Sequence, residues 1–305
     1  MRTDIIFIVG PTATGKSDAA FRLAKSAGAQ IISCDSMLIY QEPRIITSKP
    51  SKQMLDEVKH HFINIISVEE NYSVFDYYKQ CISLIDELIK KDTPLIACGG
   101  TGLYVKALLD GIFEGAGRDD ALRERLRRDA EKHGNLYLYE KLKKIDPQTA
   151  AKFSANDLKR IIRALEVYSL SGKPISAFQK EARGIYGKYN IKIFGFKVDR
   201  ERLYERINKR VGEMFSEGAV REVGGLMTKN LSLTAEKIIG IKEISGFLRG
   251  ELSEQEAGEL MKKNTRNFAK RQFTWFNKDK RIEWIDADDL SPGRLSEKIL
   301  KEIEG

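Results

Sequence analysis

Apolar residues in the first third of the chain form short runs, separated by stretches of helical periodicity. The short runs predict three strands, at residues 4–9, 30–34 and 95–98. Residues 73–91 have apolar side chains at helical spacing and begin with the capping residue Ser73, so they predict a helix before the third strand. Residues 102–109 predict a shorter helix after it. Because strands alternate with helices, we expect an α/β fold with a parallel sheet and helices on both of its faces.

The pattern changes near Gly115. Residues 119–183 have helical periodicity and no strand-like run, whereas strand-like runs return at residues 191–198 and 281–286. An all-helical domain is therefore expected to interrupt the α/β fold. The predicted division is a core of residues 1–115 and 187–305 with a helical insertion at residues 116–186.

The segment GPTATGKS directly follows the first predicted strand and matches the phosphate-binding pattern G-x-x-x-x-G-K-[ST]. A strand before it and a helix after it are the context that this motif needs, so we expect a P-loop NTPase-like sheet. Glycines let backbone N–H groups curl around an anion, the lysine adds positive charge, and the helix N-terminus favours phosphate. A di- or triphosphate is expected to bind the eight residues, Gly10, Pro11, Thr12, Ala13, Thr14, Gly15, Lys16 and Ser17, with the Ser17 hydroxyl as a ligand of Mg²⁺.

Two more polar residues follow predicted strands. Ligands bind at the carboxyl ends of the strands in such sheets, so Asp35 and Thr101 are expected beside the phosphate loop. ATP-hydrolysing P-loop proteins usually hold Mg²⁺ with an aspartate after a strand, but the strand at 95–98 ends in Gly-Gly-Thr. The loop is therefore expected to hold a diphosphate leaving group. Asp35 can order Mg²⁺ or accept a proton, and Thr101 can bind a phosphate oxygen; alternatively, each is only a cap.

The composition narrows the class of protein. The chain has 305 residues, of which 42% are hydrophobic and 31% charged, as in globular proteins. No apolar run is long enough to span a membrane and the N-terminus has no signal-peptide pattern, so a cytoplasmic protein without membrane contact is expected. The three cysteines lack metal-ligand spacing and are interpreted as core residues.

The positive charge is concentrated in two blocks. The net charge is +8, and residues 118–183 have sixteen Lys/Arg against ten Asp/Glu. Residues 258–281, which overlap a long basic helix predicted from about residue 254 to residue 277, have eight against two. Such blocks are typical of proteins that bind a polyanion such as RNA or DNA. The alternative is two solvated helical faces.

Several motifs together resemble the tRNA dimethylallyltransferase (isopentenyl transferase) family. In chain order they are GPTATGKS, SCDSMLIY, TSKP, HHFINI, GGTGLYVKALLDG, RIIRALEVYSLSGKPIS and FAKRQFTWF. The resemblance extends over nearly the whole chain. It implies a transferase whose P-loop binds dimethylallyl diphosphate in place of ATP. The prenyl group would pass to N6 of the adenosine 3′ of the anticodon, in tRNAs reading codons that begin with U, with release of diphosphate.

The resemblance also implies roles for single residues. Asp35 would be the base beside the attacking amine, and Thr101 would hydrogen-bond the bridging oxygen or hold the substrate. Lys16, with Mg²⁺ on Ser17, would stabilise the leaving diphosphate, although Ser17 alone does not exclude Mn²⁺. Arg206 and Arg210, one helical turn apart, are both candidates to clamp the diphosphate, and the sequence does not choose between them.

Contacts with the tRNA anticodon stem-loop are implied in two places. The pocket for a flipped-out base would be formed by Asp35, Ser36, Met37, Leu38 and Thr101. The helical insert would contribute Arg123, Lys159, Arg160, Ile161, Ile162 and Arg163, with the basic side chains toward phosphates and the isoleucines toward the insert's core. Many members have RGMDIGTAKP where this chain has QEPRIITSKP, which leaves contacts at residues 41–46 in doubt. A monomer is the family expectation.

Three other functions remain open from the sequence. An isopentenyl transferase for free AMP or ATP needs neither the insert nor the basic blocks, and a small-molecule kinase should have the Mg²⁺-binding aspartate. A non-catalytic RNA-binding protein with a nucleotide switch would not need Asp35 in the crevice. Tight binding of ATP or GTP would favour the kinase or the switch over the transferase.

Overall fold

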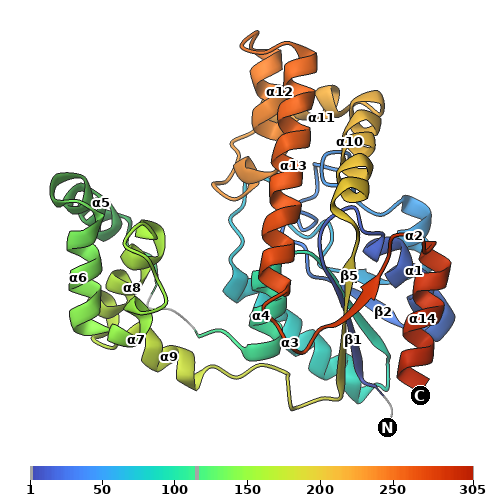
Figure 1. The fold of residues 1–305 in the computed structure, drawn as a ribbon, viewed down its shortest axis with the longest axis horizontal. Coiled ribbons are helices and arrows are strands. Elements are labelled where there is room, and N and C mark those ends of the chain that lie inside the picture. Colours follow the sequence, from blue (N-terminus) through green and yellow to red (C-terminus); the bar gives the residue numbers. More distant parts are fainter. Residues whose placement is uncertain (1–2, 114–116, 305) are drawn as a thin grey trace. The chain divides into compact units, whose positions relative to one another are not determined.

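The computed structural model describes residues 3–113 and 117–304. The chain divides into two compact units: Met1–Leu109 with Ile185–Gly305, and Asp110–Gly184 (Figure 1). The second unit, Asp110–Gly184, covers most of the segment predicted as an insert, residues 116–186. The sequence pattern was predicted to change near Gly115, and the domain boundary was placed between residues 115 and 116. These two residues lie outside the described residues.

The first unit is built on a six-stranded sheet in which every strand pair is parallel, as the alternation of strands and helices predicts. The strand order is β3-β2-β4-β1-β5-β6. The strands are β1 (Ile5–Val9), β2 (Gln30–Ser33), β3 (His60–His61), β4 (Leu95–Gly99), β5 (Ile191–Lys197) and β6 (Glu283–Asp286). The loops after β1, β2 and β4, three neighbouring strands, therefore share one edge of the sheet.

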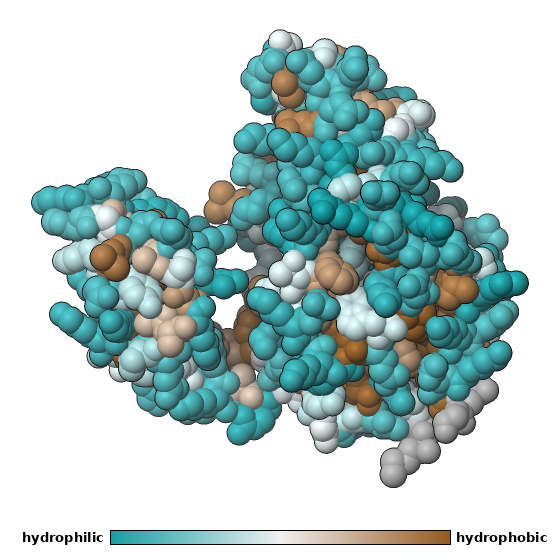
Figure 2. Space-filling view, viewed as in Figure 1, coloured by the Kyte–Doolittle hydropathy of each residue, from teal (hydrophilic) through white to brown (hydrophobic). Residues whose placement is uncertain are grey.

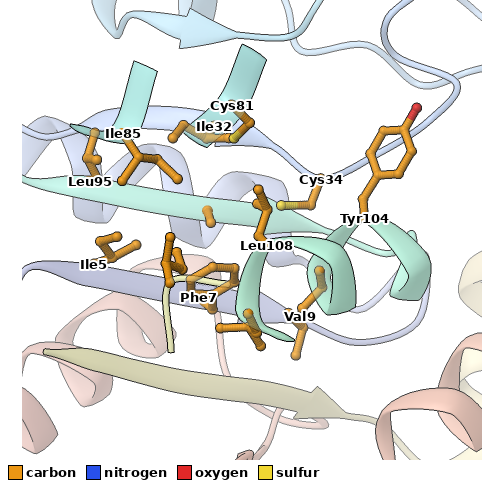
Figure 3. Packing of buried hydrophobic residues seen from close by; sticks show 14 of the residues in the cluster. Ile5, Phe7, Val9, Ile32, Cys34, Cys81, Ile85, Leu95, Tyr104 and Leu108 are labelled. Atoms are coloured by element: carbon orange, nitrogen blue, oxygen red, sulfur yellow. The ribbon is translucent and has the colours of Figure 1, made fainter. Parts of the chain in front are cut away.

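Helices cover both faces of this sheet, which confirms the predicted α/β class. Successive side chains of β1 point to opposite faces. Ile5, Phe7 and Val9 lie in the cluster that packs under α3 (Val74–Lys90) and α4 (Gly102–Asp110), shown in Figure 3. Ile8 lies in a second cluster, under α1 (Lys16–Ala27) and α14 (Pro292–Glu304).

A third cluster holds the C-terminal helices of the first unit together. Its buried members include Ile39, Tyr40, Val211, Ile244 and Met261. It joins the loop after β2 to the helices α10 (Arg200–Ser216), α11 (Ala219–Leu226), α12 (Ile241–Leu248) and α13 (Glu254–Phe276), with a 3₁₀ turn at Ala235–Lys237. A short helix, α2 (Lys52–Glu57), precedes β3. The loop after β2 is thus packed against helices that lie far along the sequence.

The second unit contains only helices among its described residues. They are α5 (Asp120–His133), α6 (Asn135–Ile145), α7 (Pro147–Ala150), α8 (Leu158–Ser171) and α9 (Ile175–Glu181). The unit has its own apolar core, which includes Leu126, Leu138, Leu142, Ile161 and Val167. Across the described part of the chain, no helix is both long and apolar enough to cross a bilayer.

Candidate active site

A cavity of about 710 Å³ opens at the carboxyl ends of β1, β2 and β4. The three predicted loops line it, so the structure brings Lys16, Asp35 and Thr101 together. Helices α10 and α13 complete the wall. The lining includes Thr12, Ala13, Thr14, Gly15, Ser17, Ser36, Met37, Leu38, Arg210, Phe268, Arg271, Gln272 and Trp275.

The phosphate loop runs from the end of β1 to the start of α1, as the motif predicts. Gly10 has φ +128° and a Cβ there would lie 2.8 Å from the Phe196 carbonyl oxygen, so only glycine fits. The Thr14 hydroxyl donates to the Pro11 carbonyl over 2.9 Å, and the Lys16 ammonium donates to the same oxygen. The loop is therefore held in its curled form by its own side chains.

Burial sets the charge of the two central ionisable groups. Desolvation lowers the pKa of Lys16 to about 8; Arg210 adds to this lowering, while Asp35 opposes it. Desolvation also raises the pKa of Asp35, against hydrogen bonds from the Met37 and Leu38 amides and the charge of Lys16. A carboxylate with a raised pKa is a better proton acceptor, and a lysine with a pKa of about 8 is still mostly an ammonium at neutral pH, which attracts an anion.

Thr101 connects two of the loops. Its hydroxyl accepts from the Ser36 amide over 3.0 Å and lies 3.2 Å from the Ser36 hydroxyl, and its amide donates to the Cys34 carbonyl over 3.0 Å. The Met37 amide in turn donates to Asp35 Oδ1 over 2.9 Å. The Thr101 side chain therefore fixes the segment that carries the candidate base.

The structure distinguishes the two arginines that the sequence could not. Arg210 lines the cavity, and its Nη1 donates to the Thr12 hydroxyl over 3.2 Å. Arg206 instead donates to the backbone carbonyls of Ala287 and Asp288, over 3.4 and 2.7 Å. One turn of α10 thus separates a cavity residue from one that holds the loop after β6.

Part of the cavity wall is apolar. Side chains from the segment after β2 and from the C-terminal helices form it: Met37, Ile46, Val211, Met214, Ile238, Ile239 and Met261. The segment at 44–46 is held by Glu222, whose carboxylate accepts three successive backbone amides, those of Arg44, Ile45 and Ile46. The atypical stretch is therefore anchored, and Ile46 contributes to the apolar wall.

Residues of the insert that are candidates for RNA contact fall into two groups. Ile161 and Ile162 are 0% and 5% exposed and belong to the insert's core, so their side chains cannot contact RNA. Lys159 and Arg160 are exposed, and the surface of the insert in view in Figure 2 is largely hydrophilic. Only the basic members of the predicted group remain available.

Glu166 is fully buried and holds the other two arginines. Arg123 donates to both of its carboxylate oxygens, over 2.7 and 2.8 Å, and Arg163 donates to one over 2.6 Å. Burial alone would raise the pKa of Glu166, but hydrogen bonds from Arg123, the Asp119 amide and Arg163 lower it to about 2. The sequence analysis did not single out Glu166, although it stands three residues after Arg163.

The aromatic residues near the end of α13 include two that the sequence analysis did not assign to the site, Phe268 and Trp275. Phe276 is buried, but Phe273 and Trp275 are 41% and 39% exposed, and Trp275 and Phe268 line the cavity. Gln272, also unforeseen, is buried between the phosphate loop and Gly100. Its only signal in the sequence is its place in FAKRQFTWF.

The oxygen donors of the cavity fit a hard cation such as Mg²⁺. They include the exposed Ser17 hydroxyl and the carboxylates of Asp18 and Asp35. No group of three or more His, Cys, Asp or Glu side chains suited to a metal occurs within residues 3–113 and 117–304. A donor set this small suits a metal that is held mainly by substrate phosphates and water.

Comparison with known proteins gives a consistent picture. A protein of Geobacter sulfurreducens described as tRNA dimethylallyltransferase is 42% identical over 287 residues, covering 93% of this chain and 92% of that protein. The crystal structure of a full-length tRNA isopentenylpyrophosphate transferase from Bacillus halodurans matches with a TM-score of 0.71 at 33% identity, over 99% of this chain and 97% of that chain.

A eukaryotic dimethylallyltransferase acting on tRNA matches with a TM-score of 0.82 at 27% identity, over 98% of this chain and 78% of that chain. The family model described as IPP transferase matches residues 38–279. The chain belongs to the IPP transferase family.

Proposed function

We propose that this member of the IPP transferase family transfers the dimethylallyl group of dimethylallyl diphosphate to N6 of the adenosine 3′ of the anticodon of a tRNA. The observation that carries the proposal is the set of side chains that line the cavity at the carboxyl ends of β1, β2 and β4. An anion-binding loop with Lys16 and Arg210, an apolar wall and the Asp35 carboxylate all line it. These are the groups that a diphosphate, a prenyl chain and an attacking amine need.

In the proposed reaction the N6 amine attacks C1 of the dimethylallyl group. The N6–C1 bond forms, the bond from C1 to the diphosphate oxygen breaks, and N6 gives up a proton. Asp35 receives this proton, since its burial raises the pKa of the carboxyl and makes the carboxylate a better base. Thr101 holds the Asp35 segment through Ser36 and lines the same cavity.

The departing diphosphate gathers negative charge, which the phosphate loop is arranged to receive. The N-terminus of α1, the Lys16 ammonium and the Arg210 guanidinium stabilise it. Ser17, with Asp18, would hold Mg²⁺, which when bound would supply further charge stabilisation to the diphosphate. Arg206 has no part in this clamp, since its guanidinium is bound to backbone carbonyls outside the cavity.

The insert is proposed to bind the anticodon stem-loop. Lys159 and Arg160 provide exposed positive charge, and Arg123 and Arg163 present guanidinium groups whose orientation Glu166 fixes. Phosphate contacts of this kind position an RNA without reading its sequence. The base to be modified would enter the pocket formed by Asp35, Ser36, Met37, Leu38 and Thr101.

A transfer assay tests this function. The protein is incubated with Mg²⁺ and labelled dimethylallyl diphosphate, and with either an unmodified tRNA that has adenosine 3′ of its anticodon or free AMP. Label in the tRNA alone supports the proposal. Label in AMP would move the protein to nucleotide prenylation, and label in neither, with tight ATP binding, would favour the kinase.

A second measurement tests the role of the insert. Arg160→Ala should weaken tRNA binding and reduce the dependence of the binding constant on salt, because one phosphate contact is lost. The matched control is Arg128→Ala on α5, another exposed arginine, which the resemblance does not place at the RNA. An equal salt dependence for wild type and Arg160→Ala would remove this residue from the RNA interface.

A further inference from the structure

Gln272 is the feature of the cavity that the mechanism above does not use. It lies on α13, is 5% exposed and uses both ends of its side-chain amide. Its Oε1 accepts from the Thr12 backbone amide over 2.8 Å, and its Nε2 donates to the Gly100 carbonyl over 2.9 Å. One side chain thus joins the loop after β1 to the loop after β4.

The surroundings of Gln272 leave it little freedom. A Cβ at Gly100 would lie 2.1 Å from Gln272 Nε2, so a side chain at residue 100 would displace the amide. A Cβ at Gly99 would instead lie 2.3 Å from the Cys34 carbonyl. The two glycines therefore have separate purposes: Gly99 lets the β2 and β4 loops approach, and Gly100 makes room for Gln272.

The hydrogen bond from Thr12 to Gln272 also involves a residue that Arg210 contacts. Thr12 is held twice, by Gln272 at its amide and by Arg210 at its hydroxyl. On the other side, Gly100 is followed by Thr101, which fixes the segment of Asp35 through Ser36. Displacing the Gln272 amide would therefore remove the connection between the loop of Thr12, which Arg210 also contacts, and the loop of Thr101, which holds the Asp35 segment.

We propose that Gln272 is a positioning residue that sets the distance between the diphosphate loop and the loop that carries Thr101. This inference rests on the proposed function, because it assigns the two loops to one reaction. Gln272 acts through Thr12 and Gly100 and makes no contact with the reacting atoms. Its loss should therefore affect binding of the diphosphate donor first, and affinity for RNA little.

The test is Gln272→Met, which keeps the length of the side chain and removes both hydrogen bonds. The matched control is Asn264→Leu on the same helix, which removes the amide that donates to Glu243 Oε1 over 2.6 Å, outside the cavity lining. With tRNA saturating, Gln272→Met should raise KM for dimethylallyl diphosphate about ten-fold or more, since two buried backbone groups lose their partner. Its dissociation constant for tRNA should stay within about two-fold of wild type, on the same reasoning.

Gly100→Ala provides an independent variant, since it should push the amide aside and reproduce the donor effect of Gln272→Met. Thermal melting of all three variants separates this effect from a general loss of stability. If Gln272→Met and Asn264→Leu have the same kinetic constants, the positioning role is wrong. It is also wrong if Gln272→Met weakens tRNA binding and leaves KM for the donor unchanged.

Calorimetry with inorganic pyrophosphate keeps this test separate from the proposed function. If wild type transfers no label, the function fails, but pyrophosphate should still bind wild type about ten-fold more tightly than it binds Gln272→Met. Equal pyrophosphate affinities would overturn the inference about Gln272 whatever the transfer assay gives.

Discussion

The buried carboxylate of the insert offers the sharpest test of how the two units are stabilised. Glu166→Gln removes the negative charge that Arg123 and Arg163 both contact. It also places an amide N–H₂, which is a donor, where the guanidinium donors need an acceptor. The pKa of Glu166 falls from 4.5 to about 2 on folding, as the three hydrogen bonds outweigh burial. A lowering of this size corresponds to about 3 kcal/mol of stability at neutral pH.

The sign of the pH dependence follows from the direction of the shift. Because the folded state binds the proton more weakly than the unfolded state, the stabilisation is complete above about pH 4.5. It is lost as the pH falls toward 2. The two arginines are 22% and 33% exposed, so water can partly replace the carboxylate, and the loss should stay near the lower end of the 3–5 kcal/mol range for broken buried pairs.

The positions of the tryptophans provide the assay. The chain has two tryptophans, Trp275 and Trp284, and both belong to the first unit. The second unit, Asp110–Gly184, contributes helices to the circular-dichroism signal. Tryptophan fluorescence therefore follows the first unit alone, while circular dichroism at 222 nm follows both. Glu166→Gln should lower the melting temperature of the circular-dichroism component from the insert by about 10–20 °C. It should leave the fluorescence transition in place.

Glu124→Gln is the control, because it removes one carboxylate from the same unit at an exposed ion pair with Arg127 and Arg128. Its effect should be below about 1 kcal/mol, as for other surface pairs. Equal effects of the two substitutions would refute the argument from burial. A fluorescence transition that shifts together with the circular-dichroism transition would refute independent unfolding of the insert.

Four further predictions concern the cavity. Asp35→Asn should lower kcat by about two to four powers of ten with tRNA affinity nearly unchanged, as for loss of a general base, and a kcat within ten-fold of wild type would exclude that role. Wild-type activity should fall on the acid side at a pH above the usual range of aspartate, since burial raises the pKa of Asp35. Steady-state kinetics should show that Arg210→Ala raises KM for the donor at least ten-fold and that Arg206→Ala does not. The opposite result would show that the assignment of the two arginines is wrong. Burial lowers the pKa of Lys16 to about 8, so pyrophosphate binding at pH 9 should be accompanied by uptake of a proton. Calorimetry in buffers of different protonation enthalpy should detect this uptake in wild type and not in Lys16→Met.

Periodicity in the sequence was sufficient to predict most of the sheet. The apolar runs at 4–9, 30–34 and 95–98 became β1, β2 and β4, because a strand buried on both faces is apolar throughout. The two-residue strand β3 at His60–His61 was missed, since two residues cannot show a period. The predicted convergence of three strand ends was correct, because parallel strands necessarily end at one edge.

What the sequence could not supply were contacts between distant segments. Thr12 and Gln272 are separated by 260 positions, and no local pattern links them. Arg206 and Arg210 have the same helical phase to within a fraction of a turn, so their different partners depend on which neighbouring segment faces each turn of α10. In the insert, helical spacing correctly predicted that Ile161 and Ile162 face the core, but it did not reveal the buried carboxylate behind Arg163.

These contacts explain why binding of RNA and chemistry should respond to different substitutions. The insert has a core of its own, and its arginines take their orientation from Glu166 within the same unit. The proposed diphosphate clamp takes its geometry from α10 and α13, which belong to the first unit together with Lys16 and Asp35. Each set of cations is therefore positioned by its own unit. Substitutions at Glu166 should change the affinity for tRNA and the stability of the insert, whereas substitutions at Gln272 or Arg210 should change use of the diphosphate donor. A double variant of Glu166 and Gln272 should accordingly show the sum of the two single effects on the free energies, because residues without shared partners behave additively.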